Sequence, residues 1–177
     1  FPQGGRIFLC NQQQTGSWYD INHTESKEMQ QREVFTLGLN HGTNPRNATY
    51  AYIIAPGITS ARQMNAYNKK NGIEILANTD AMQIVRNKKL NIWQMVFYRE
   101  GTFTHKYITV KLDKACALML KDIYQSSAEL HIADPAQSQS CIKVDVYIPK
   151  VSKNTRSILC DFEKTGIYAG ASKKYSL

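Results

Sequence analysis

Hydrophobic and polar residues alternate with a period of two along most of the chain. The clearest example is the stretch 142–148, IKVDVYI, in which aliphatic residues occupy every second position. The stretch 128–132, AELHI, alternates in the same way, and the turn-forming sequence DPAQSQS lies between the two, at 134–140. A period of two is typical of a strand with one buried and one solvent-facing side. The pattern therefore predicts a β-hairpin formed by these two strands.

Further short strands are predicted wherever β-branched, aromatic and aliphatic residues gather between clusters of Gly, Asn, Asp or Lys. These strands are expected at 34–39, 50–55, 73–76, 82–85, 92–98, 107–112, 115–120 and 157–162. Many short strands at close spacing favour an antiparallel sheet or sandwich, so the expected fold class is all-β.

The sequence SARQMNAYNKKNG, at 60–72, predicts one short helix that links two β regions. Ser60 can cap its first turn, because a serine hydroxyl accepts a hydrogen bond from a free backbone N–H. Lys69 and Lys70 suit the negative end of the helix dipole, and Gly72 can terminate the helix.

The region before this helix is more polar. Residues 12–22 surround a single tryptophan, Trp18, with polar side chains, and residues 24–33 are expected to form a charged loop. About fifty-eight residues with few strands bury little surface by themselves. This region is therefore expected to be the end of a larger sheet. The C-terminal sequence GASKKYSL is expected to be a solvated or frayed basic tail.

Composition and charge narrow the class of protein. A chain of 177 residues with 42% hydrophobic residues can bury a core, which predicts a globular fold. The formal net charge of +8 favours an anionic partner, such as a nucleic acid, a membrane surface or an acidic polysaccharide. The chain has no apolar run of about eighteen residues, so no membrane span is expected. It begins FPQGGR, without an initiating Met or a signal-peptide pattern, as expected of a processed chain or an excised piece.

Local motifs for metal or catalytic chemistry are absent from the sequence. The four cysteines, Cys10, Cys116, Cys141 and Cys160, are scattered without a C-x-x-C pair, and no histidine stands at metal-ligand spacing. We therefore expect neither a metal site nor a cofactor. Cys116 and Cys160 lie among apolar residues and are expected to be buried free thiols, although an oxidising compartment would allow two disulfides.

The stretch LNHGTNPRNATYAYIIAPG, at 39–57, gathers His41, Arg46, Tyr50 and Tyr52 around a turn. A His or Tyr general base is one interpretation of this arrangement. The favoured interpretation is structural, with both tyrosines on one face of a strand, where aromatic rings cover a neighbouring sheet.

Basic residues occur as pairs and small groups, at Lys69–Lys70, at Arg86, Lys88 and Lys89, and at Lys173–Lys174. Each group suits either a polyanion groove or a solvated edge that blocks strand pairing. Arg86, Lys88 and Lys89 are the candidate substrate-binding residues. Nucleic-acid binding rests on charge alone, because no aromatic nucleic-acid motif accompanies it, and no nucleic-acid partner is expected.

Two stretches together resemble a known family. The pattern H-G-x-x-P-x-x-A-x-Y-A-Y-x-x-x-P-G fits residues 41–57, and N-T-x-x-x-Q-x-V-x-x-x-K-L fits residues 78–90. With TGSWYDIN before them and LHIADPAQ after them, they make about residues 16–149 similar to the C-terminal part of the polysaccharide lyases of family 8. This family includes chondroitin, hyaluronan and xanthan lyases.

The resemblance implies an arrangement of domains. Such enzymes have an N-terminal α/α toroid, a central β supersandwich and a smaller C-terminal antiparallel β domain. Residues 1–60 would be the end of the supersandwich, 61–72 a linking helix, and 73–177 the C-terminal domain. A secreted, periplasmic or cell-surface location is implied as well.

The resemblance also implies a reaction, the β-elimination of a uronic-acid polysaccharide, in which a Tyr moves the proton and Asn and His groups neutralise the carboxylate. The family's catalytic residues precede the part of the enzyme that this chain resembles, so no catalytic residue is expected here. The expected role is to support the toroid and border the substrate cleft. The expected partners are an acidic polysaccharide of the glycosaminoglycan type and the upstream domains. The alternative is a stand-alone module that binds acidic glycans, motivated by Trp18, the tyrosines and the basic pairs.

Overall fold

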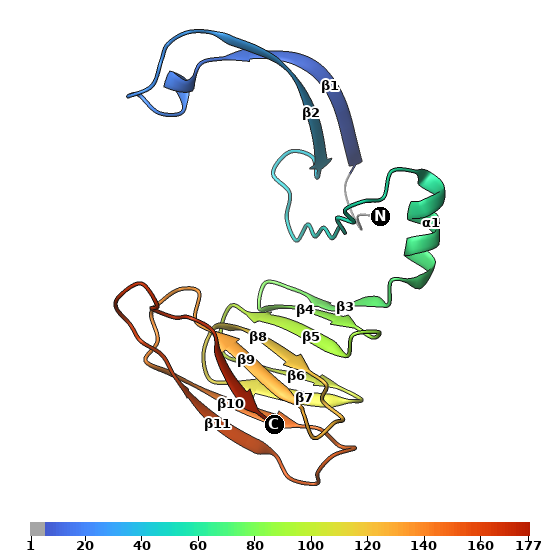
Figure 1. Cartoon of the computed structure of the whole chain (residues 1–177), viewed down its shortest axis with the longest axis vertical. Coiled ribbons are helices and arrows are strands. Elements are labelled where there is room, and N and C mark those ends of the chain that lie inside the picture. Colours follow the sequence, from blue (N-terminus) through green and yellow to red (C-terminus); the bar gives the residue numbers. More distant parts are fainter. Residues whose placement is uncertain (1–5) are drawn as a thin grey trace. The chain divides into compact units, whose positions relative to one another are not determined.

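The computed structural model describes residues 6–177, and the chain divides into two compact units, residues 1–57 and 58–177 (Figure 1). Unit 1 is built on one long hairpin, in which strand β1 (Arg6–Gly16) pairs antiparallel with β2 (Gln30–Asn40). A 3-10 helix, η1 (Trp18–Asp20), lies between the strands. The Asp20 carboxylate accepts a hydrogen bond of 2.9 Å from the backbone N–H of Ser17 and closes the turn.

The sequence pattern missed half of this hairpin. Strand β1 was not predicted, because polar residues occupy both of its faces from Asn11 to Thr15 and no period of two is visible there. The expected charged loop at 24–33 is shorter than predicted, since β2 already begins at Gln30.

The strand predicted at 50–55 is wrong. This segment forms no strand, and it joins neither the β1–β2 sheet nor any other sheet of residues 6–177. Alternating aromatic and aliphatic residues suit a strand, but a strand also needs a neighbour to complete its hydrogen bonds. Tyr50 and Tyr52 therefore do not lie on a strand, and both are more than half exposed, with their rings stacked at a centroid distance of 6.3 Å.

The predicted helix is confirmed as α1 (Ala61–Lys70), in unit 2. The Ser60 hydroxyl accepts a hydrogen bond of 3.3 Å from the backbone N–H of Gln63, as expected of an N-cap. Gly72 follows the helix with φ of +74°, a conformation that glycine adopts without strain.

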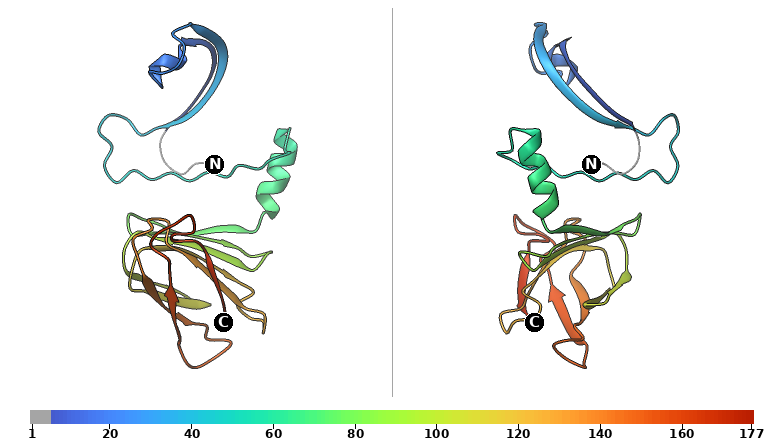
Figure 2. Two further views of the ribbon diagram at one scale, coloured as in Figure 1. Left: turned by 60° about the vertical axis from the view of Figure 1, so that its left-hand side comes forward. Right: turned by 90° about the vertical axis from the view of Figure 1, so that its right-hand side faces the viewer.

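The rest of unit 2 is an antiparallel β-sandwich, which confirms the all-β fold class (Figure 2). One sheet has six strands in the order β12-β9-β8-β5-β4-β3, and the other has four in the order β11-β10-β7-β6. The strands of the first sheet are β3 (Ile73–Asn78), β4 (Met82–Asn87), β5 (Ile92–Phe97), β8 (Cys116–Lys121), β9 (Glu129–Ala133) and β12 (Lys173–Ser176). Those of the second are β6 (Gly101–His105), β7 (Ile108–Leu112), β10 (Cys141–Tyr147) and β11 (Arg156–Asp161).

The core lies between the two sheets and follows the period of two. On β10, Ile142 and Val144 are fully buried, while Lys143 between them is exposed. On β9, Leu130 is fully buried, and Trp93 of β5 is fully buried in the same cluster. Burial of one face of each strand is what holds two sheets together, at about 25 cal/mol per Å² of apolar surface removed from water.

The hairpin predicted for residues 128–148 is wrong, although both of its strands exist. Strand β9 pairs with β8 and β12, whereas β10 pairs with β7 and β11, so the two strands belong to opposite sheets. Their alternating pattern requires one buried face per strand, and a sandwich satisfies this as well as a hairpin does. The connection is organised by the buried Asp134, whose carboxylate accepts hydrogen bonds from the backbone N–H groups of Ser138 at 2.7 Å and Gln139 at 2.6 Å.

The C-terminal segment is not a frayed tail. Residues Lys173–Ser176 form the edge strand β12, which pairs with β9, and Tyr175 and Leu177 pack against the core. Two lysines at the start of the strand concealed its apolar positions in the sequence. The thiols agree with expectation: all four cysteines are free, and Cys116 and Cys160 are buried.

Candidate functional site

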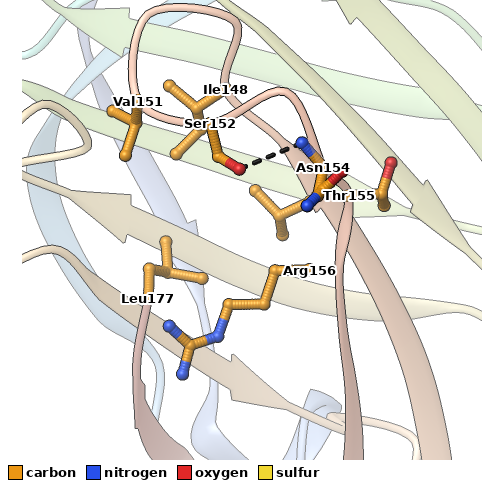
Figure 3. Close-up of a pocket in the computed structure, with 8 residues that line it drawn as sticks. Ile148, Val151, Ser152, Asn154, Thr155, Arg156 and Leu177 are labelled. Carbon is orange, nitrogen blue, oxygen red and sulfur yellow. Dashed lines mark hydrogen bonds between the residues drawn. The ribbon is translucent and has the colours of Figure 1, made fainter.

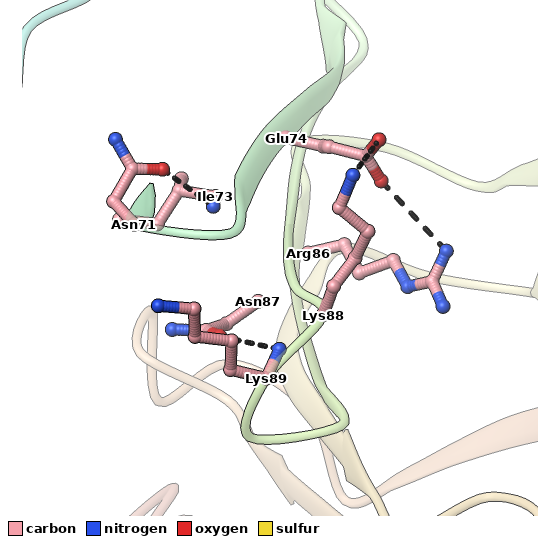
Figure 4. Close-up of polar contacts among 7 residues, drawn as sticks. All are labelled: Asn71, Ile73, Glu74, Arg86, Asn87, Lys88 and Lys89. Atoms are coloured by element: carbon pink, nitrogen blue, oxygen red, sulfur yellow. Dashed lines mark hydrogen bonds and ion pairs between the residues drawn. The ribbon is translucent and has the colours of Figure 1, made fainter. Parts of the chain in front are cut away.

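The three predicted substrate-binding residues lie at the end of strand β4 and in the turn that follows it. The Asn87 side-chain oxygen accepts hydrogen bonds from the backbone N–H groups of Lys89 at 3.0 Å and Leu90 at 3.1 Å, which closes the turn. Asn91 completes it with φ of +50°, a left-handed conformation that asparagine tolerates. This turn brings Arg86, Lys88 and Lys89 together on a short stretch of chain (Figure 4).

The carboxylate of Glu74 neutralises part of this basic group (Figure 4). Glu74 lies opposite Arg86 in the β3–β4 register, and its carboxylate is 2.9 Å from the Lys88 Nζ and 3.7 Å from an Arg86 guanidinium nitrogen. The hydrogen bond from Lys88 lowers the pKa of Glu74 and is the largest cause of that shift. Ion pairs at a surface contribute about 1 kcal/mol or less, so Lys88 remains able to exchange partners.

Arg86 is a largely buried cation, which its sequence neighbours did not indicate. It shares the core-facing side of β4 with the fully buried Ile84, two residues earlier, and its side chain is 13% exposed. The guanidinium carbon lies 4.7 Å from the ring centre of Trp93, its cross-strand partner, and 4.7 Å from that of Tyr107. The cation is therefore held between two aromatic rings, in the arrangement favoured by cation–π attraction.

Lys89 is an exposed lysine whose stem packs against the end of the helix. A Cβ atom added to Gly72 would lie 3.1 Å from the Lys89 Cγ, and the backbone N–H of Lys88 donates to the Gly72 carbonyl at 2.9 Å. The structure thus brings the three candidates together in the chain, yet gives each a different environment. It assigns none of them a ligand.

The other basic pairs have structural surroundings as well. Lys69 and Lys70 lie in the last turn of α1. The Lys174 Nζ is 2.6 Å from the carboxylate of Glu129 on the neighbouring strand, and the His131 imidazole is 3.0 Å from the same carboxylate. These two hydrogen bonds, with that from Lys174 the stronger, lower the pKa of Glu129 to about 2. A triad of this kind links β9 to the edge strand β12.

His41 and its neighbours form a corner rather than a catalytic constellation. The Asn40 side chain accepts a hydrogen bond of 2.8 Å from the backbone N–H of Gly42, whose φ is +82°. The His41 ring lies 6.3 Å from that of Tyr50, centre to centre. The buried His41 Nε2 has no hydrogen-bond partner among the described residues, so no carboxylate supports His41 as a general base through this atom.

A pocket of about 340 Å³ lies under the loop between β10 and β11 (Figure 3). Aliphatic side chains from Val146, Ile148, Val151 and Leu177 make up much of its lining, and Arg156 is its one ionisable group. The Ser152 hydroxyl accepts a hydrogen bond of 3.0 Å from the backbone N–H of Asn154. The other polar residues of the lining, Ser152, Asn154 and Thr155, have no ionisable side chain, so Arg156 has no acid–base partner among the side chains that line the pocket.

Within residues 6–177, no group of three or more His, Cys, Asp and Glu side chains is arranged to hold a metal ion. No helix in the same part of the chain is both long and apolar enough to cross a membrane.

Comparison with known proteins gives two matches that divide the chain. The family model for the super-sandwich domain of polysaccharide lyase family 8 matches residues 1–68, and the model for the C-terminal beta-sandwich domain of the same family matches residues 74–143. The chain belongs to polysaccharide lyase family 8. This confirms the resemblance carried by residues 41–57 and 78–90, which fall one in each matched region.

Individual members of the lyase family agree. The chain is 35% identical over 172 residues to the chondroitinase-AC of Pedobacter heparinus, covering 97% of this chain and 24% of that protein. It is 34% identical over 143 residues to a xanthan lyase of a Bacillus species, covering 79% of this chain and 15% of that lyase. A solved structure of a chondroitinase AC lyase in complex with oligosaccharides superimposes with a TM-score of 0.80 at 32% identity, over 97% of this chain and 25% of that one. The chain therefore spans about a quarter of the length of this chondroitinase.

Proposed function

We propose that this chain is the non-catalytic C-terminal β region of a polysaccharide lyase that cleaves uronic-acid polysaccharides of the chondroitin sulfate and hyaluronan type by β-elimination. In this proposal residues 1–60 complete the supersandwich, residues 61–72 form the linking helix, and residues 73–177 are the C-terminal domain. Together they support an upstream toroid and border its substrate cleft. The polysaccharide and the upstream domains are then its partners, in a secreted, periplasmic or cell-surface enzyme.

The exposed apolar face of the β1–β2 hairpin carries the proposal. The register sets Ile7 opposite Leu39 and Leu9 opposite Leu37, and facing residues of an antiparallel pair share one side of the sheet. Phe35 lies two residues from Leu37 on the same side. Four of these five side chains, those of Ile7, Leu9, Phe35 and Leu37, are 48 to 64% exposed.

A two-stranded hairpin of this kind is marginally stable in water at best. An apolar face of this size requires another layer of protein, and the described residues provide none. Further strands and a facing sheet of the supersandwich supply such a layer, in agreement with the match of residues 1–68 to part of that domain. The charge of +8 suits an acidic polysaccharide through long-range attraction.

One experiment tests the catalytic half of the proposal. The purified 177-residue chain is incubated with chondroitin, hyaluronan and xanthan, and the ultraviolet absorbance of the unsaturated product is followed. We expect no turnover on any substrate. Turnover by the chain alone, free of contaminating lyase, would overturn the proposal.

A second experiment tests the structural half. We expect the chain to self-associate in solution, because the apolar face is exposed. Replacing both Leu9 and Leu37 with Gln should reduce this association. A matched variant replaces Gln12 and Gln14 of the same hairpin with Ser, because these even-numbered positions of β1 lie on the side opposite Leu9 and Leu37. Light scattering that responds equally to both variants would contradict the assignment of this face as a buried interface.

A further inference from the structure

One end of the unit 2 sandwich gathers cations around aromatic rings. The stack of Trp93, Arg86 and Tyr107 is extended by two lysines from different loops. The Lys106 Nζ lies 4.7 Å from the centre of the Tyr107 ring, and the Lys150 Nζ lies 5.9 Å from the same centre. Three cations are therefore within about 6 Å of one ring, the range in which cation–π attraction operates.

A second tyrosine widens this surface. The Tyr124 ring meets that of Tyr107 edge to face at a centroid distance of 6.3 Å, and the Lys150 Nζ lies 5.8 Å from the Tyr124 centre. Tyr124 is 37% exposed, and Lys106 and Lys150 are exposed. We call the five residues Arg86, Lys106, Tyr107, Tyr124 and Lys150 the cationic aromatic patch. They come from β4 and from three separate loops, so no single stretch of sequence contains the patch.

Positive charge in the patch exceeds the negative charge near it. Glu74 is the carboxylate that contacts the patch, through its 3.7 Å ion pair with Arg86, and it is shared with Lys88 at 2.9 Å. His105 adjoins Tyr107 at a ring distance of 5.1 Å, and burial, followed by the charges of Arg86 and Lys106, lowers its pKa. The hydrogen bond from Lys106 lowers the pKa of Tyr107. The charges of Arg86 and Lys106 add to both shifts in the same direction, after burial for His105 and the hydrogen bond for Tyr107.

The interior of the same cluster contains polar atoms that the protein leaves unpaired. Among residues 6–177, four buried side-chain nitrogen atoms have no hydrogen-bond partner, and three of them are the Arg86 Nε, the Trp93 Nε1 and the His105 Nδ1. Buried donors without partners are uncommon in folded proteins and destabilise them. Three of the four unpaired nitrogen atoms therefore lie together at this end of the sandwich.

We propose that the cationic aromatic patch binds an acidic sugar residue of a polysaccharide, with Lys106 and Lys150 contacting its carboxylate or sulfate group and the exposed parts of Tyr107 and Tyr124 contacting its ring. Lysine ammonium groups form charge-assisted hydrogen bonds with such oxyanions. The electron-rich face of a tyrosine ring suits the weakly positive C–H groups of a pyranose ring. This inference rests on the proposed function, because it identifies where the polyanionic substrate contacts unit 2.

The patch differs from the basic group predicted from the sequence. Arg86 belongs to both, but Lys88 is paired with Glu74 and Lys89 packs against the helix end, whereas Lys106 and Lys150 have no ion pair among the described residues. The cations of the patch that no carboxylate of residues 6–177 neutralises are thus the two loop lysines.

Titration calorimetry on the full 177-residue chain tests the proposal with four probes. Two probes are acidic oligosaccharides: one of chondroitin sulfate, which carries carboxylate and sulfate groups, and one of hyaluronan, which carries carboxylate groups only. The third is a neutral oligosaccharide of N-acetylglucosamine, and the fourth is a single-stranded DNA of matched charge. We expect the chain to bind the chondroitin sulfate and hyaluronan oligosaccharides. Its affinity should be higher for chondroitin sulfate if the patch recognises the sulfate group, and equal for the two if it recognises the carboxylate. Neutral sugar should not bind, and DNA should bind more weakly than chondroitin sulfate.

The deciding variant is Lys106→Gln with Lys150→Gln, and the matched control is Lys69→Gln with Lys70→Gln on α1. Both variants lower the net charge equally, so only the patch variant should weaken oligosaccharide binding, by about tenfold or more. Replacing Tyr124 with Ala should weaken binding further without changing the net charge. Unfolding midpoints of all variants confirm that these exposed substitutions leave the fold intact.

Three results would each overturn the proposal: no binding by the wild-type chain at millimolar oligosaccharide, equal loss in the patch and control variants, or equal binding of DNA. None of them produces turnover, so the proposed function would fail separately, through lyase activity of the chain alone.

Discussion

Replacing Gly170 with Ala should destabilise unit 2 strongly, because this glycine touches the backbone of the loop that joins the two sheets. Gly170 has φ of +65°, and a Cβ atom placed there would lie 2.0 Å from the carbonyl oxygen of Asp134. A contact this short involves backbone rather than a movable side chain, so one of the two segments must shift. The shift would break the 3.0 Å hydrogen bond from the Asp134 N–H to the Gly170 carbonyl, and the 3.0 Å bond from the Gly170 N–H to the carbonyl of Glu163.

The magnitude follows from these terms. A left-handed conformation costs a non-glycine residue about 1 to 2 kcal/mol, and each lost hydrogen bond about 1 kcal/mol, so we expect a loss of about 3 to 4 kcal/mol. Gly166→Ala is the matched control, because Gly166 also has a positive φ, +88°, but nothing lies within 4 Å of its added Cβ. The control should lose only the conformational term, about 1 to 2 kcal/mol.

Urea unfolding followed by tryptophan fluorescence measures the difference. The experiment uses a Trp18→Phe background, in which the fully buried Trp93 is the one remaining tryptophan and reports on the core of unit 2. A gap of about 2 kcal/mol between Gly170→Ala and Gly166→Ala is expected, or about 8 °C in melting temperature for a unit of this size. Equal destabilisation by the two variants would show that the contact with Asp134 is not rigid, and would refute the reasoning.

Three further predictions follow from groups of unit 2. The pKa of Glu129 is held at about 2, below its usual value of 4.5, so its stabilising effect is complete above about pH 4.5 and lost as the pH falls towards 2. The difference in melting temperature between wild type and Glu129→Gln should therefore shrink as the pH falls through that window. A difference that stays constant would contradict the pairing of Glu129 with Lys174. Burial raises the pKa of Cys116 to about 12 and raises that of Cys160, so neither thiol should react with a disulfide reagent at pH 8 until urea exposes it. Rapid reaction of all four cysteines in the native chain would contradict this prediction. Because the apolar core lies within unit 2, residues 58–177 expressed alone should unfold cooperatively, with the same unfolding midpoint as unit 2 has in the whole chain. A non-cooperative transition would argue against the independence of unit 2.

Features that depend on neighbours in sequence were predictable. The strand at 142–148 and its buried face follow from a period of two, since successive side chains of a strand point to opposite sides. The helix beginning after Ser60 follows from its cap and from the basic residues in its last turn. Family membership could also be predicted, because residues 41–57 and 78–90 keep a spacing that local structure constrains.

Features that depend on which segments meet were decided by the tertiary structure. The alternating pattern of β9 and β10 fits a hairpin and a sandwich equally, and only packing assigns the two strands to opposite sheets. Residues 50–55 have a strand-like composition but find no neighbouring strand within the described chain, whereas the lysine-rich Lys173–Ser176 finds one in β9. Strand pairing is a property of two segments, so the sequence of one segment cannot determine it.

The same distinction applies to the candidate site. The sequence placed Arg86 with Lys88 and Lys89 because they are adjacent, yet the fold turns Arg86 towards the core, between Trp93 and Tyr107. Lys106 and Lys150, which lie beside that ring, come from loops that are far apart in the chain. Composition determined that this protein is basic and suited to a polyanion. The tertiary structure decided where its cations converge, because three loops meet at one end of the sandwich and a charge acts through distance in space rather than along the sequence.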